Sequence, residues 1–297
     1  MGDAGEAPSD APPDFSTQFV RTPDGRDLCF AEWGDLAGRP VFWIHGSPGC
    51  RLFSAVRIEN GFEEVVRSCG VHLVTYDLPG NGRSTRLPGR RVANAAADIA
   101  TIADALHLRR FGVVGGSSGS GPTMAAGTLL PDRVTRIVPY APIAPRVELG
   151  PEEWSRGQDT ETLEYLGWVQ EGEDRAAIQF ARLDAEYRAA AQAGNPADAS
   201  VFERTRNGVW GWVDDEVSHQ RDWGFDVASI SVPTRIWYDP DDTVVPRQQA
   251  EWLARHIPGA QLVESKALGH GSTGDPVPEW REILAWVTAG DPADPRP

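Results

Sequence analysis

Long hydrophobic runs, paired cysteines and an excess of positive charge are all missing from this sequence. No apolar stretch in the 297 residues is long enough to span a bilayer, so we expect no membrane-spanning helix. The three cysteines are odd in number and lack metal-ligand spacing, which predicts reduced thiols in the cytoplasm. The net charge of −15 disfavours a partner with a phosphate backbone, such as nucleic acid.

The two ends of the chain have the composition of tails. Residues 1–16 are acidic and rich in Pro and Ala, without the basic segment and apolar core of a signal peptide. We expect them to be disordered, and residues 290–297 likewise. The chain between them is long enough for one large core with an insertion, as a monomer or homodimer.

Strand-like and helix-like segments alternate along most of the chain. Asp24-Gly25 between the first two strand-like runs is a hairpin signal. The later alternation predicts βαβ units and a mostly parallel, eight-stranded sheet flanked by helices. Strands are expected at residues 18–21, 28–33, 41–45, 71–76, 111–114, 134–140, 234–238 and 261–264, and helices at 52–68, 92–108, 118–130, 246–256 and 277–288.

The alternation stops at residues 146–225, which contain no clear strand. This segment is rich in Glu, Ala, Arg and Trp and predicts several helices inserted into the α/β core. We therefore expect a core at residues 17–145 and 226–289 with a helical cap at 146–225. A cap over the strand ends would form an apolar pocket, with five tryptophans as candidate substrate contacts. They are Trp154, Trp168, Trp210, Trp212 and Trp223.

The sequence Gly115-Gly116-Ser117-Ser118-Gly119 joins a predicted strand to a predicted helix. The pattern G-x-S-x-G in this context predicts a sharp, strained turn that exposes the hydroxyl of Ser117. Glycine at 115 and 119 removes side chains that would collide across the turn. The amide of Ser118, at the start of the helix, points where a carbonyl oxygen would become negative, so it is a candidate oxyanion-hole donor.

A nucleophilic serine needs a base, and the base needs an orienting acid. His270 lies in a glycine-rich loop after the last strand, where a side chain can reach a serine at the top of the sheet. His256 closes a helix and suits a structural role. Asp239, Asp241 and Asp242 follow the strand at 234–238, and Asp242 is our choice with Asp241 as its nearest competitor. Asp77 precedes the serine and fits a structural turn.

Four stretches at predicted strand ends together resemble the α/β-hydrolase superfamily. They are His45-Gly46-Ser47-Pro48-Gly49, Asp77-x-x-Gly80-x-Gly82-x-Ser84, Gly115-x-Ser117-x-Gly119, and Asp242-x-Val244-Val245-Pro246 followed by Gly269-His270. The resemblance implies a catalytic triad of Ser117, Asp242 and His270, with the amide of Ser47 as the second oxyanion-hole donor. It makes His45 a structural residue, and Gly46 and Pro48 neighbours of the substrate.

The resemblance implies a serine hydrolase without metal or organic cofactor. Serine at the turn argues against the haloalkane dehalogenases and most epoxide hydrolases of this fold, which use Asp there. The loop at residues 45–49 is similar to that of proline iminopeptidases, with Ser47 in place of glycine. From the aromatic cap we expect hydrolysis of a carboxylic ester or lactone of a bulky apolar small molecule. The alternatives are a peptidase or amidase, a C–C bond hydrolase, a cofactor-free perhydrolase or dioxygenase, and a small-molecule receptor.

Overall fold

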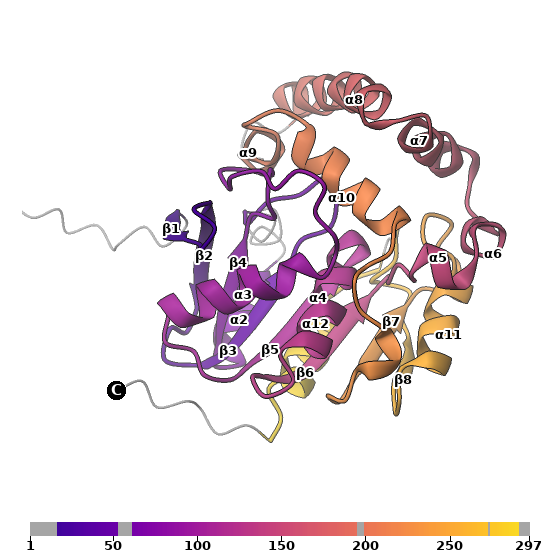
Figure 1. Ribbon diagram of the computed structural model, residues 1–297. Helices are drawn as coiled ribbons and strands as arrows, with labels where there is room; N and C mark the ends of the chain where they lie inside the picture. The colour runs from indigo at the N-terminus through magenta and orange to yellow at the C-terminus, as the bar shows by residue number, and fades with distance from the viewer. Residues whose placement is uncertain (1–16, 53–60, 195–198, 273, 291–297) are drawn as a thin grey trace, which may run out of the picture.

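An eight-stranded sheet runs through the computed structural model, which describes residues 17–52, 61–194, 199–272 and 274–290 (Figure 1). The strand order is β1-β2-β4-β3-β5-β6-β7-β8. β2 pairs antiparallel with β1 and β4, and the remaining pairs are parallel. The predicted mostly parallel sheet is therefore confirmed. The strands are β1 Gln18–Arg21, β2 Asp27–Gly34, β3 Arg39–Ile44, β4 Val71–Tyr76, β5 Phe111–Gly116, β6 Val134–Tyr140, β7 Arg235–Tyr238 and β8 Gln261–Glu264.

Helices cover both faces of the sheet, because buried strands alternate apolar side chains between the two faces. In β3, Val41 and Trp43 belong to the apolar cluster under α2 Phe62–Ser68 and α12 Val277–Val287. Phe42 and Ile44 belong to the opposite cluster, under α3 Asn94–Ala105, α4 Ser120–Leu129 and α11 Arg247–His256. Of the helix predicted at 52–68, residues 53–60 lie outside the described residues.

The chain between β6 and β7 is helical, as the sequence indicates, and lies across one end of the sheet (Figure 1). We call α5–α10 the cap segment; whether it is a separate domain stays a prediction. Part of it has its own apolar cluster, in which Phe180 and Trp212 stack with ring centroids 4.5 Å apart. The cap segment comprises α5 Arg146–Leu149, α6 Pro151–Ser155, α7 Thr160–Gln170, α8 Glu173–Gly194, α9 Ala199–Arg204 and α10 Trp210–Gln220.

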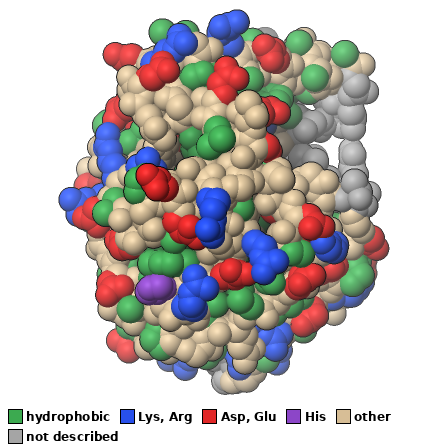
Figure 2. Space-filling view, turned by 90° about the vertical axis from the view of Figure 1, so that its right-hand side faces the viewer, with side chains coloured by type: hydrophobic (Ala, Val, Ile, Leu, Met, Phe, Trp, Pro, Cys, Tyr) green, Lys and Arg blue, Asp and Glu red, His purple; other side chains and the backbone are tan. Residues whose placement is uncertain are grey.

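Acidic and basic side chains are interspersed on the face shown in Figure 2, with hydrophobic side chains scattered among them. Several opposite charges pair within one helix, such as Arg247 and Glu251, which are 2.7 Å apart in α11. Among the described residues, no helix has both the length and the apolar character needed to cross a membrane.

Candidate active site

The turn after β5 has the strained geometry that its sequence predicts. Ser117 has a φ of 53°, in the left-handed region that non-glycine residues rarely adopt. A Cβ at Gly115 would lie 2.4 Å from the carbonyl oxygen of Gly119, and one at Gly119 would lie 2.6 Å from that of His45. A side chain at Gly115 would therefore collide within the turn itself, and one at Gly119 would push the turn away from the end of β3. A short 3₁₀ turn, Ser117–Gly119, leads into α4, which begins at Ser120 rather than at the predicted residue 118.

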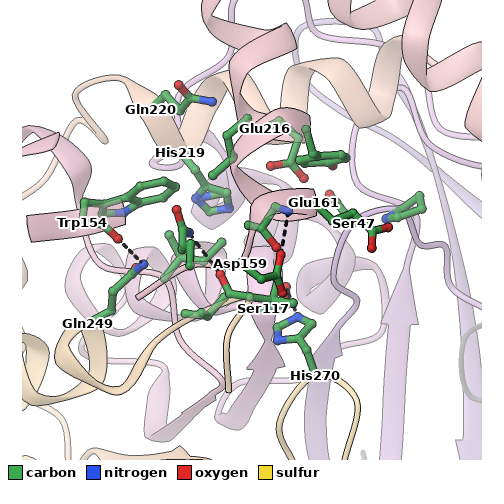
Figure 3. Close-up of a pocket in the computed structure, with 18 of the residues that line it drawn as sticks. Ser47, Ser117, Trp154, Asp159, Glu161, Glu216, His219, Gln220, Gln249 and His270 are labelled. Atoms are coloured by element: carbon green, nitrogen blue, oxygen red, sulfur yellow. Dashed lines mark hydrogen bonds between the residues drawn. The ribbon is translucent and has the colours of Figure 1, made fainter. Parts of the chain in front are cut away.

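Ser117, His270 and Asp242 form a continuous chain of hydrogen bonds. The Nδ1 atom of His270 lies 2.9 Å from Oδ2 of Asp242, so it carries the proton that this carboxylate accepts. The Nε2 atom of the same ring is then free to accept from the hydroxyl of Ser117, 3.0 Å away. Figure 3 shows Ser117 and His270 together at the floor of a cavity. The three residues chosen from the sequence thus come together from three strand ends.

Asp242 is fixed as an acceptor by its own turn. Its Oδ1 accepts the backbone N–H groups of Val244 and Val245, at 2.9 and 3.0 Å. Its Oδ2 also accepts the backbone N–H of His270 at 2.9 Å. Burial raises the pKa of Asp242, but the hydrogen bonds and charge of His270 together with these backbone donors outweigh burial and leave the pKa below its usual value. Asp242 is therefore ionised at neutral pH.

The other carboxylates considered as the triad acid make different contacts. The side chain of Asp241 is 79% exposed and pairs with Lys266. Asp239 accepts from the backbone N–H of Asp241 at 3.0 Å and from the hydroxyl of Ser272 at 3.2 Å. Asp77 is buried and holds the guanidinium of Arg51 at 2.8 Å, which is a structural contact.

The loop after β3 lies against the serine. A Cβ at Gly46 would be 3.1 Å from Cβ of Ser117. His45 braces the loop, because its Nε2 accepts the backbone N–H of Leu78 at 3.2 Å while its Nδ1 donates to the carbonyl of Gly46 at 2.8 Å. The hydroxyl of Ser47 donates to Oδ2 of Asp215, a residue of α10, at 2.8 Å. This geometry is compatible with the predicted structural role of His45 and with an amide of Ser47 near the reacting carbon.

A cavity of about 280 Å³ lies between the serine and the cap segment, near the lower end of the size range of small-molecule sites. Its core side includes Ser47, Pro48, Ser117 and His270. A second cavity shares these four residues and extends toward Tyr140 and Trp280, with Gly46 in its wall. The cap side of the first cavity is formed by Trp154, Gln158, Asp159, Glu161, Thr162, Tyr165, Leu166, Tyr187, Trp212, Glu216, His219 and Gln220.

Two of the five predicted tryptophans, Trp154 and Trp212, line the first cavity. The other three do not line it, because their rings pack within or against the protein elsewhere. Trp168 packs against the apolar cluster of the cap segment. Trp210 lies under the guanidinium of Arg86, 4.4 Å from its ring centre. Trp223 is fully buried in the core cluster beside α4.

Three residues of α10 at the site were not singled out from the sequence: Asp215, Glu216 and His219. All three are buried, and Figure 3 shows Glu216 and His219 on the cap side of the cavity. Burial raises the pKa of Glu216 to about 8, with the hydrogen bond of Tyr165 opposing this and the charge of Asp215 adding to it. The run Asp214-Asp215-Glu216 looks like a solvated helix face. Its position among buried aromatic residues is the one signal that could have marked it.

Among the described residues, no three His, Cys, Asp or Glu side chains come together in a group that could hold a metal ion. The buried cysteine thiols are also unsuited to chemistry. Burial, with a smaller contribution from the charge of Asp77, raises the pKa of Cys29 to about 12, and burial likewise raises that of Cys50 beside the loop after β3.

Comparison with known proteins agrees with this architecture. The family model for the alpha/beta hydrolase fold matches residues 39–273. A 2-hydroxy-6-oxo-2,4-heptadienoate hydrolase from Pseudomonas putida is 28% identical over 79% of this chain and 83% of its own. A non-heme chloroperoxidase from Streptomyces lividans is 27% identical over 85% of this chain and 92% of its own.

Among solved structures, an enol-lactonase from Burkholderia xenovorans superposes with a TM-score of 0.65 at 15% identity, over 91% of this chain and 99% of its own. This likeness bears on the fold alone. The family match covers well over half of the sequence and includes every strand from β3 to β8. The chain therefore belongs to the alpha/beta hydrolase fold family.

Proposed function

We propose that this protein is a serine hydrolase that cleaves an uncharged, largely apolar ester or lactone through an acyl-enzyme on Ser117. The observation that carries the proposal is the hydrogen-bonded chain from Ser117 through His270 to Asp242, which opens onto a partly aromatic cavity. This is the arrangement that activates a serine hydroxyl for attack on a carbonyl carbon.

In the first step, the hydroxyl of Ser117 attacks the carbonyl carbon while Nε2 of His270 takes its proton. The ionised carboxylate of Asp242 holds the ring and stabilises its positive form. His270 then donates this proton to the leaving alcohol. In the second step the same nitrogen takes a proton from water as the water attacks the acyl carbon. It then returns this proton to the Ser117 oxygen as the acyl bond breaks and the acid leaves.

The negative oxygen formed in each step needs fixed donors, and the backbone amides of Ser47 and Ser118 are assigned this role. Ser118 directly follows the nucleophile at the start of the 3₁₀ turn. Ser47 lies on the loop that packs against Ser117. Donors held in place before the reaction stabilise the charge without having to reorganise.

The charges around the first cavity support the substrate class. Among the described residues that line it there is no Lys or Arg to pair with a carboxylate. Asp159, Glu161 and Glu216 line it instead, and the pKa of Asp159 is lowered by hydrogen bonds from the backbone N–H and side chain of Thr162 and from the hydroxyl of Thr243. A negatively charged substrate in this cavity would meet Asp159 and Glu161 without a compensating cation, while Glu216, with a pKa of about 8, stays protonated and uncharged at neutral pH. Aromatic side chains such as Trp154 and Trp212 favour an apolar acyl or alcohol group.

The same carboxyl groups favour a second candidate, an amidase similar to the iminopeptidases, because a substrate amine could pair with them. The two candidates share the triad and differ in the charge of the group that enters the cavity. The comparison with a chloroperoxidase also makes peroxide-dependent halogenation worth measuring in the same assays.

The experiment combines a fluorophosphonate probe with matched substrates. Wild type and Ser117→Ala are examined by intact mass after labelling and by hydrolysis of three series: neutral aryl esters and lactones, the same esters bearing a carboxylate, and amino-acid arylamides. Ser155→Ala is the control, because this hydroxyl bonds within its own helix, 3.0 Å from the carbonyl of Pro151.

We expect one label per wild-type and Ser155→Ala molecule, none on Ser117→Ala, and hydrolysis that is lost only in Ser117→Ala. Neutral esters should react at least about tenfold faster than their carboxylate-bearing analogues, which meet the uncompensated cavity carboxyls. Faster turnover of arylamides would favour the amidase. Labelling without turnover, or with a single slow turnover, would favour a receptor, and unchanged activity in Ser117→Ala would refute the mechanism.

A further inference from the structure

Helix α10 of the cap segment contacts both residues whose amides are assigned to the oxyanion hole, Ser47 and Ser118. Oδ2 of Asp215 accepts the hydroxyl of Ser47 at 2.8 Å. Nε2 of His219 lies 2.7 Å from the carbonyl oxygen of Ser118 and therefore donates its proton to it. Asp215 and His219 are four residues apart, so they lie on the same face of the helix.

Asp215 is itself held in place from the core. It accepts the side-chain amide of Asn81 at 2.8 Å and pairs with the guanidinium of Arg90. Burial raises the pKa of Asp215, but the charge of Arg90 and the hydrogen bonds of Arg90 and Ser47 outweigh it, and the net pKa lies below the usual value. The acceptor for Ser47 is therefore a charged carboxylate that cannot turn away without leaving Arg90 unpaired.

The ring of His219 is also held in place by its surroundings. Its side chain is buried, packs edge-on against Trp223 with ring centres 5.6 Å apart, and lies so close to Gly121 that a Cβ there would be 2.6 Å from its Cε1. Burial lowers the pKa of His219 to about 4; the charge of Asp215 opposes this and that of Arg90 adds to it. The ring is neutral at pH 7, and its single proton sits on Nε2, where the carbonyl of Ser118 accepts it.

We propose that α10 is a positioning element of the oxyanion hole, in which Asp215 fixes the amide of Ser47 and His219 fixes the amide of Ser118. The inference rests on the acyl-enzyme mechanism proposed above. Each contact is made to another group of the residue whose amide donates, the hydroxyl of Ser47 and the carbonyl of Ser118, so neither side chain has to touch the reacting carbon. A cap helix of this kind contributes to the rate of the chemical step and not only to substrate binding.

Two substitutions remove one contact each and leave the backbone donors present. Ser47→Ala removes the hydroxyl held by Asp215, and His219→Leu removes the donor to Ser118. A displaced oxyanion donor should lower kcat by about 10- to 100-fold, less than the complete loss of a donor. The affinity for an aryl trifluoromethyl ketone, whose adduct with Ser117 carries the same negative oxygen, should fall by the same factor, with KM changed less than about threefold. His219→Gln, which restores an N–H donor, should recover part of both.

Asp214→Asn is the matched control. Asp214 is the neighbour of Asp215 on α10, is equally buried, and pairs with Arg86 at 2.7 Å, but no contact joins it to Ser47 or Ser118. It should lower the urea midpoint of unfolding while kcat and ketone affinity stay within about twofold of wild type.

The outcomes separate this inference from the proposed function. If Ser117→Ala abolishes labelling while Ser47→Ala and His219→Leu keep wild-type kcat and ketone affinity, the hydrolase stands and the role of α10 is wrong. If Asp214→Asn loses kcat as severely as the other two, α10 acts only through stability, and the inference is overturned as well. Full activity in Ser117→Ala would overturn both proposals.

Discussion

Replacing Glu216 by Gln should make the stability of the protein much less sensitive to pH. Glu216 lies in the wall of the first cavity, and its side chain is buried beside Tyr165. Burial raises its pKa from 4.5 to about 8 in the folded protein. The unfolded chain has the ordinary value, so between these two pH values the folded state binds a proton that the unfolded state has lost.

The sign of the effect follows from this proton balance. The contribution of Glu216 to the free energy of unfolding is fully present below pH 4.5. It is lost as pH rises through the folded pKa of about 8, because the folded state must then ionise a buried carboxyl group. At about 1.4 kcal/mol for each pH unit, the contribution of Glu216 falls by about 3 to 4 kcal/mol between pH 5 and pH 8. Glutamine has nearly the same shape and no titrating proton, so this contribution disappears in Glu216→Gln.

His219 contributes a slope of the opposite sign at lower pH. Its folded pKa of about 4 lies below its ordinary value of 6.5, so the unfolded state binds the proton first and stability is lost as pH falls through this window. This term is present in both wild type and Glu216→Gln. It therefore cancels in the difference between the two proteins, which isolates the effect of Glu216.

The measurement is urea unfolding of wild type and Glu216→Gln at pH 5, 6, 7 and 8, with Glu186→Gln as the control for an exposed glutamate of α8. The stability of Glu216→Gln relative to wild type should increase by about 3 to 4 kcal/mol from pH 5 to pH 8. Glu186→Gln should follow wild type at every pH. A relative increase below about 1 kcal/mol would show that Glu216 ionises normally and would refute the reasoning.

Three further substitutions test other parts of the structure. Asp242→Asn should lower kcat by about three to four orders of magnitude with little change in circular dichroism, because a neutral amide no longer stabilises the charged ring of His270; activity within about tenfold of wild type would exclude Asp242 as the triad acid. Gly211→Ala should cost about 1–3 kcal/mol in urea unfolding, because its Cβ would lie 2.2 Å from the carbonyl carbon of Gly80. Gly167→Ala in α7, with open space at its Cβ, should instead stabilise by about 0.5–1 kcal/mol; equal effects of the two would contradict this account of how α10 packs.

The residues that approach one another around Ser117 were predictable because the fold itself brings them together. In a parallel sheet the carboxyl ends of the strands meet at one edge, so residues that follow β5, β7 and β8 are near each other wherever the strands are identified. The position after the strand led us to choose Asp242 with Asp241 as its nearest competitor, and the family resemblance agreed with that choice. The structure adds a physical reason, since Asp242 is buried among backbone donors while Asp241 is exposed.

The cap side of the site was not predictable from the sequence to the same degree. Helix periodicity indicates which face of α10 is apolar, but not that Asp215 contacts Ser47 and His219 contacts Ser118. That placement depends on how the cap segment packs on the core, through contacts such as Gly211 on Gly80 and Asp215 with Arg90. For the same reason, the sequence did not predict which of the five tryptophans line the cavity, because composition does not say which rings face it.

Lys266, which pairs with Asp241 beside the turn that carries Asp242, is the only lysine in the sequence. The other basic side chains, histidine aside, are arginines, which do not react with active esters or aldehydes under mild conditions. The side chain of Lys266 is 58% exposed, and this residue lies four positions before His270. Apart from the amino terminus, amine-directed immobilisation would therefore attach every molecule through this one point, in a single orientation that turns the His270 loop toward the support.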